Sequence, residues 1–189
     1  MSEIGVSNTT STVRSGNVAR VRTEEQAASA LVKIFVGLRG IPSVAQTVWY
    51  DGVDDGTRQD ETEDNFGLYR QPADSIEAFQ PKQSAAAAGY LLRQLEGYRF
   101  RSLQSLGSDV RMYTFVNNAG DQRRVLWRDA PYADTESGPV TLAVTARPGY
   151  RTSVTSITGE AIQSELGPGT VEVSVGTEPI YLNETPASS

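Results

Sequence analysis

The stretch QSAAAAGYLLRQLEG, residues 83–97, decides the fold, because the periodicity of the sequence changes where this stretch ends. Apolar residues recur within it at helical spacing, and Gly97 closes the pattern. The stretch therefore predicts a helix over residues 83–96, and the side expected to be buried carries Ala85, Ala88, Leu91, Leu92 and Leu95.

Beyond residue 97 the sequence shows short strand patterns and no helical segment. The strands are expected at residues 110–116, 124–127, 140–144, 153–157, 171–175 and 180–182. The sequence NNAGD at 117–121 predicts a hairpin turn, and PG at 148–149 and GPG at 167–169 separate later strands. This half is expected to form a small antiparallel β-sandwich of about six to eight strands, with residues 183–189 as a frayed tail.

Before residue 83 the pattern is that of an α/β protein. A strand end at residues 1–6 carries Glu3, and Thr23 with Gln26 forms a capping box that begins a helix. That helix should stop at Gly40 and Pro42, and a strand covered on both faces should follow at 44–50. The order strand, helix, strand, loop and helix is typical of βα units. Because the pattern changes to short strands after residue 97, we expect two domains, 1–97 and 98–189. The buried side of the first helix is expected to carry Ala27, Leu31, Ile34, Phe35 and Leu38.

Residues 51–65 form an acidic segment in which Arg58 is the single basic residue. Calcium binding is one interpretation, because carboxylate oxygens suit that ion. An EF-hand beginning at Asp51 fails, however, because Val53 and Thr62 occupy ligand positions. The segment is therefore expected to be a solvated loop without a metal. Its acidic residues are Asp51, Asp54, Asp55, Asp60, Glu61, Glu63 and Asp64.

Composition excludes several classes of function. The net charge of −6 and the pI of about 4.8 argue against binding to nucleic acid or to anionic membranes. No apolar run approaches the roughly 20 residues of a membrane helix, and no signal peptide is visible, so a soluble chain is expected. The chain has no Cys and no His, which excludes thiol and imidazole catalysis and leaves carboxylate, Lys, Tyr and hydroxyl chemistry. We expect no cofactor.

The order of these segments resembles the carboxy-terminal part of clan A glycoside hydrolases, which are (β/α)₈ barrels, near families five and thirty-nine. The string SEIGV (2–6) looks like the end of the seventh barrel strand, and EEQA (24–27) looks like the start of the seventh helix. VWYD (48–51) resembles the eighth strand, and NFGLY (65–69) with Pro81-Lys82 resembles the passage into the eighth helix. The later strands resemble the β-sandwich that follows the barrel.

The resemblance implies a fold and a site. The fold is a partial (β/α)₈ barrel, its last two β/α units, followed by the small antiparallel β-sandwich. Glu3 matches the catalytic nucleophile of a retaining glycosidase, while the general acid belongs to a fourth strand that the chain begins after. Trp49, Tyr50 and Asp51 match positions at the barrel mouth and are expected to contact carbohydrate. Strand alternation lets only one of Trp49 and Tyr50 face a site, and we favour Trp49, although a buried packing aromatic is the plainer interpretation.

The expected function is therefore the C-terminal portion of a retaining O-glycosyl hydrolase that is inactive as an isolated piece. Retaining hydrolysis needs two carboxyl groups about 5–5.5 Å apart, and only Glu3 matches one of them. The expected partners are a carbohydrate and either an upstream barrel chain or another copy of this chain. The alternative is a non-catalytic carbohydrate-binding or structural module built on a vestigial glycosidase.

Overall fold

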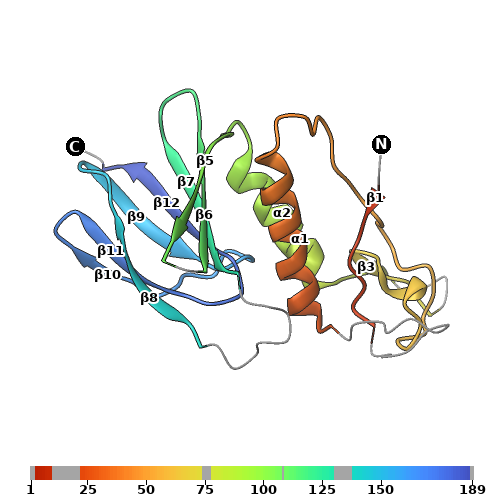
Figure 1. The fold of residues 1–189 in the computed structure, drawn as a ribbon. Coiled ribbons are helices and arrows are strands. Elements are labelled where there is room, and N and C mark those ends of the chain that lie inside the picture. Colours follow the sequence, from red (N-terminus) through yellow and green to blue (C-terminus); the bar gives the residue numbers. More distant parts are fainter. Residues whose placement is uncertain (1–2, 10–21, 74–77, 108, 130–137, 188–189) are drawn as a thin grey trace. The chain divides into compact units, whose positions relative to one another are not determined.

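The computed structural model describes residues 3–9, 22–73, 78–107, 109–129 and 138–187 (Figure 1). The chain divides into two compact units. The first unit holds Met1–Leu38 and Pro42–Gly89, and the second holds Arg39–Ile41 and Tyr90–Ser189. Neither helix in the described part of the chain is long and apolar enough to cross a membrane.

In the first unit, helix α1 (Glu24–Arg39) begins at the predicted capping box. The backbone N–H of Gln26 donates to the Thr23 hydroxyl oxygen at 3.2 Å, and the Thr23 N–H donates to the Gln26 side-chain oxygen at 3.0 Å. The helix stops before Gly40, as predicted. Its buried stripe differs from the expected one, because Ile34, Phe35 and Leu38 are only half-buried. The buried residues are Ala27, Ala28, Leu31, Val32 and Val36.

Strands β1 (Glu3–Ile4) and β2 (Val48–Trp49) pair in parallel, as the barrel pattern requires. The expected strand at 44–50 is shorter in the structure, and it is half-exposed rather than covered on both faces. The reason is that β2 has one partner strand among the described residues, and that partner contributes two residues. The acidic segment ends in the 3₁₀ helix η1 (Glu63–Asn65), and β3 (Tyr69–Arg70) then pairs antiparallel with β4 (Gln80–Pro81).

Helix α2 (Gln83–Leu95) lies where the sequence predicts it, but its buried face is rotated. Ser84, Ala87, Leu91 and Leu95 are buried at spacings of three and four residues. Leu92, expected inside, is 62% exposed, and Ala85 and Ala88 are half-buried. The error arose because Ala and Leu occur all round this helix, so composition did not mark one face.

The second unit is the predicted antiparallel β-sandwich (Figure 1). Its larger sheet has the order β5-β6-β7-β12-β9 and its smaller sheet the order β10-β11-β8. The six expected strands are confirmed, and the turn at 117–121 is closed by the Gly120 N–H donating to the Asn117 carbonyl at 3.1 Å. The strands are β5 (Arg99–Leu106), β6 (Val110–Val116), β7 (Gln122–Arg128), β8 (Val140–Thr145), β9 (Tyr150–Thr155), β10 (Glu165–Gly167), β11 (Thr170–Val175) and β12 (Ile180–Pro186).

Three features of the sandwich differ from expectation. Strands β5 and β10 were not predicted, because β5 is rich in Arg, Ser and Gln and β10 is wholly exposed. The expected tail from Asn183 is instead part of β12, which pairs with both β7 and β9 and buries Glu184 completely. Central pairing fixes these polar residues in a strand, although their composition suggested fraying.

The core of the sandwich lies between the two sheets. It contains Val110, Met112, Leu126, Leu182 and further valines of β8, β9 and β11. On the other face of the larger sheet, the Tyr90 ring meets the Tyr181 ring edge-on at 5.3 Å, and the Tyr90 hydroxyl lies 2.8 Å from that of Thr155. These contacts explain why the second unit begins at Tyr90, whereas the sequence pattern changes at Gly97.

Candidate functional site

The carboxyl ends of β1 and β2 lie side by side, and they bring together the backbones of all four predicted site residues. Glu3 is opposite Val48 and Ile4 is opposite Trp49 in the parallel register. The Tyr50 N–H then donates to the Ile4 carbonyl at 2.9 Å. Because both strands run the same way, the residues that follow each of them meet at one edge.

Gly5 permits this close approach. A Cβ at residue 5 would lie 2.1 Å from the Tyr50 carbonyl oxygen and 3.0 Å from the Phe66 ring, so no other residue fits there without displacing backbone. The glycine two residues after Glu3 therefore sets how near Tyr50 comes to β1. The peptide bond from Tyr50 to Asp51 is cis.

The Trp49 and Tyr50 side chains have different surroundings. The Trp49 ring packs against Phe35 of α1, with ring centroids 6.0 Å apart, and its indole N–H is buried without an acceptor among the described residues. The Tyr50 ring meets Phe66 edge-on at 5.7 Å, and its hydroxyl donates to Asp55 at 2.7 Å. The alternation of the strand thus places Trp49 against the helix and Tyr50 against the acidic segment.

Asp51 lies at the start of the acidic segment with its carboxylate held locally. The Val53 N–H donates to Asp51 Oδ1 at 2.6 Å, and the Leu68 N–H donates to the Asp51 carbonyl at 3.1 Å. Burial raises the pKa of the Asp51 carboxyl from its usual value, and the Val53 hydrogen bond opposes this effect. The hydrogen bond to Asp55 raises the pKa of Tyr50 to about 12. Two carboxylates and a protonated phenol therefore surround the end of β2.

The segments that follow β1 and β2 also contribute to a buried ionic cluster, which the sequence analysis missed. Lys82 Nζ donates to Asp54 Oδ1 at 2.5 Å and to Asn8 Oδ1 at 2.8 Å, and it lies 3.4 Å from the Asn65 carbonyl. The Lys82 and Asp54 side chains are 1% and 2% exposed. Asp54 Oδ1 also accepts the Gly67 N–H at 2.8 Å. The expectation that residues 51–65 form a solvated loop is therefore wrong at Asp54. This carboxylate is buried and pairs with Lys82, which lies in a later segment of the chain.

The same cluster ties the segment that follows β1 to the acidic segment. The Ser7 hydroxyl donates to the Thr62 carbonyl at 3.0 Å, and Asn65 Nδ2 donates to the Arg58 and Glu61 carbonyls at 2.7 and 2.6 Å. The clue available in the sequence was that Lys82 is one of two lysines and follows a segment with seven acidic residues. No group of acidic side chains in the described ranges is arranged to hold a metal ion.

A cavity of about 220 Å³ is lined in part by the acidic segment. Asp54, Gln59, Arg70 and Gln80 are among its lining residues, and none of the four predicted site residues lines it. This cavity and the edge formed by β1 and β2 are therefore separate features of the first unit.

Comparison with known protein families and with curated proteins gives no match. Solved structures do match. A family 39 glycoside hydrolase from Bacteroides cellulosilyticus WH2 is 24% identical with a TM-score of 0.73, and the match covers 97% of this chain and 33% of that one. The catalytic domain of the GH30 xylanase C from Talaromyces cellulolyticus is 14% identical with a TM-score of 0.65, covering 97% and 40%. SrfJ from Salmonella typhimurium is 10% identical with a TM-score of 0.58, covering 100% and 35%.

These likenesses confirm the fold predicted from the sequence. The fold of the chain is like that of the last β/α units and the following sandwich in these structures, and the chain spans about a third of their length. At identities below 25% the likeness concerns the fold.

Proposed function

We propose that this chain is the C-terminal portion of a retaining O-glycosyl hydrolase, in which Glu3 is the nucleophile and the end of β2, at Trp49, Tyr50 and Asp51, borders the sugar. The observation that carries the proposal is the parallel register of β1 with β2, which sets the backbone of Glu3 beside the end of the strand bearing the aromatic pair. Active sites of (β/α)₈ barrels lie at the carboxyl ends of their strands, and the fold likeness extends over 97% of the chain.

In this proposal the ionised Glu3 attacks the anomeric carbon, the glycosidic bond breaks, and a glycosyl-enzyme ester forms that water later hydrolyses. A second carboxyl group must first give its proton to the leaving oxygen and then take one from water. The resemblance assigns that role to a strand that no residue here matches, so we propose that the chain by itself binds sugar without cleaving it.

The surroundings of Trp49 support a site that another element completes. Its indole N–H is buried without an acceptor in the described part of the chain, and a buried donor of this kind normally has a partner. A sugar hydroxyl, an upstream barrel chain or another copy of this chain would each supply one. Tyr50 offers a half-buried ring whose hydroxyl is already fixed by Asp55, which suits a rigid contact surface for a sugar ring.

The test uses the whole chain with a panel of aryl glycosides and the matching oligosaccharides. We expect no hydrolysis, and we expect chemical-shift changes at the Gly5 and Tyr50 amides when a matching oligosaccharide binds. Tyr50→Ala should abolish those changes, and the control Tyr69→Ala, at an exposed tyrosine of β3, should leave them intact. Turnover that survives Glu3→Gln would refute the assignment of the nucleophile. Turnover that Glu3→Gln abolishes would refute the inactivity of the chain alone and point to a recruited acid such as Asp51 or Asp54.

The second candidate is a non-catalytic carbohydrate-binding module. The observation that favours it is that the sandwich has grooves of its own. Oligosaccharide-induced shifts confined to the second unit, with none at Gly5 or Tyr50, would support this candidate over the first.

A further inference from the structure

The inner face of the larger sheet is only partly covered, because three strands face five. Beyond the edge of β8 this face opens into a groove of about 480 Å³, lined by residues of β5, β6, β7 and β8. The inner face is apolar under the smaller sheet, at Val110, Leu126 and Leu182, and becomes polar in the groove. The polar lining residues include Ser102, Gln104, Thr114, Gln122 and Thr145.

A β-bulge directs one arginine into this groove. Phe100 pairs with Phe115 and Ser102 pairs with Thr114, so Arg101 is an extra residue in β5. An extra residue in one strand changes the direction of the side chain next to it. Arg101 consequently lines the groove together with Ser102. It is exposed, and no carboxylate pairs with it among the described residues.

Arg124 forms the floor of the groove, and a buried glutamate holds it. Its Nη2 donates to Glu184 Oε2 at 2.7 Å and its Nη1 donates to the Thr145 carbonyl at 2.7 Å. Glu184 is completely buried, and its other oxygen accepts the Arg147 N–H at 2.8 Å. The charge of Arg124 is thereby neutralised and its position fixed.

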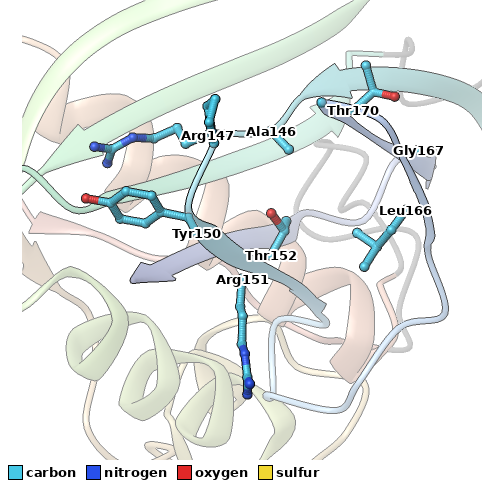
Figure 2. A pocket seen from close by; sticks show the side chains of 10 residues that line it. Ala146, Arg147, Tyr150, Arg151, Thr152, Leu166, Gly167 and Thr170 are labelled. Atoms are coloured by element: carbon cyan, nitrogen blue, oxygen red, sulfur yellow. The ribbon is translucent and has the colours of Figure 1, made fainter. Parts of the chain in front are cut away.

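Arg147 closes the groove at the turn between β8 and β9. Its guanidinium lies over the Tyr150 ring, 3.8 Å from the centroid, and donates to the Gly120 carbonyl at 2.6 Å. These partners are uncharged, so they hold the guanidinium without neutralising it. Figure 2 shows the Arg147 and Tyr150 side chains extending to the same side, away from Leu166.

The side chains in Figure 2 line a second groove, which has a volume of about 610 Å³ and shares Arg147 with the groove beside β8. Its wall includes Leu166, which is 70% exposed, and the glycines of the turn between β10 and β11. Arg147 and Arg151 also line that groove, but no side-chain amide does. The groove beside β8 combines Arg101 and Arg147, which no lining carboxylate offsets, with the side-chain amides and hydroxyls of β5 to β8, in a chain of net charge −6.

We propose that the groove beside β8 binds a carboxylate-bearing saccharide. Guanidinium groups pair with carboxylates through two parallel hydrogen bonds, and the surrounding amides and hydroxyls suit sugar hydroxyls. No aromatic side chain lines this groove, so stacking of a neutral sugar ring does not explain it. Its volume falls in the range of small-molecule sites. The proposal uses no residue of the site at β1 and β2, so this proposal and the proposed function can fail or hold independently.

Isothermal titration of the whole chain at low salt with digalacturonic acid tests the proposal. We expect binding, and we expect Arg101→Gln and Arg147→Gln each to weaken it roughly tenfold, since each removes a charge-assisted hydrogen bond. The control Arg93→Gln makes the same charge change on α2, outside the groove, and should leave the affinity unchanged. Circular dichroism checks that each variant is folded. If Arg147→Gln does not fold, Arg101→Gln decides the matter, because the Arg101 side chain is exposed.

Two further arms separate the sources of binding. A neutral digalactoside should bind at least roughly tenfold more weakly than the diacid, and sulfate should not displace the diacid at equal concentration. Absence of binding, equal affinity for the neutral sugar, displacement by sulfate, or equal weakening by Arg93→Gln would each overturn the proposal.

Discussion

Replacing Lys82 by methionine is expected to lower the free energy of unfolding by about 3 to 5 kcal/mol, the cost of removing one partner from a buried ion pair. The contacts account for this magnitude. Lys82 Nζ supplies hydrogen bonds to Asp54 and Asn8, and its removal leaves the Asp54 side chain, 2% exposed, with the Gly67 N–H as its remaining hydrogen-bond donor among the described residues. Methionine fills a similar volume, so the loss reflects charge rather than packing.

The pH dependence of Lys82→Met has a definite sign. Burial already raises the pKa of the Asp54 carboxyl, and Lys82 opposes that rise, so removal of Lys82 raises the pKa further. The folded variant then binds a proton more tightly than the unfolded chain does. Its stability is therefore greatest below the usual pKa of an aspartic acid and falls as the pH rises through the raised one.

The assay is urea unfolding followed by fluorescence in a Trp127→Phe background, which leaves Trp49 in the first unit as the sole tryptophan. Arg58→Met is the matched control, because it removes a cation from the same acidic segment where the side chain is 67% exposed, and it should cost no more than about 1 kcal/mol. Lys82→Met with Asp54→Asn should recover much of the loss, since no buried charge remains. Equal costs for Lys82→Met and Arg58→Met would refute the reasoning.

Three other outcomes are expected. Asp55→Asn should lower the pKa of Tyr50 from about 12 toward 10, because the hydrogen bond to Asp55 is the main cause of the raised value. Ultraviolet titration against a Tyr50→Phe reference measures this pKa. An unchanged pKa would show that the hydrogen bond does not form in solution. Gly67→Ala should destabilise the first unit by about 1 to 3 kcal/mol, because its Cβ would lie 2.2 Å from the Asp54 backbone nitrogen. The control Gly52→Ala should be neutral, because its Cβ would meet nothing within 4 Å, and thermal unfolding measures both variants. Limited proteolysis should cut within residues 57–64 before it cuts any strand of the sandwich, and early cleavage within the sheets would contradict the predicted two-domain division.

Much of the fold follows from interactions between residues close together in the sequence. The capping box joins Thr23 to Gln26, and the turn at 117–121 joins Asn117 to Gly120. Apolar residues alternate with polar ones along β11, and β6 and the start of β12 are rich in apolar residues. Such patterns are visible without tertiary information because the period of a strand or helix is set by its own backbone.

The candidate site could be predicted only in part. The roles of Glu3, Trp49, Tyr50 and Asp51 come from resemblance and remain predictions, while their nearness follows from the parallel pairing of β1 with β2. No local pattern distinguishes the surroundings of Trp49 from those of Tyr50. Contacts with Phe35 and Phe66, on separate segments, decide them.

The sequence by itself determined the helices, most of the strands and their division into a βα half and a sandwich half. Tertiary structure alone decided which polar residues are buried. Lys82 reaches Asp54 across 28 residues of chain and Asn8 across 74, and Arg124 reaches Glu184 across 60. A charged side chain can be buried only where a partner meets it, and that meeting depends on how distant segments pack, so no short window of sequence reveals it.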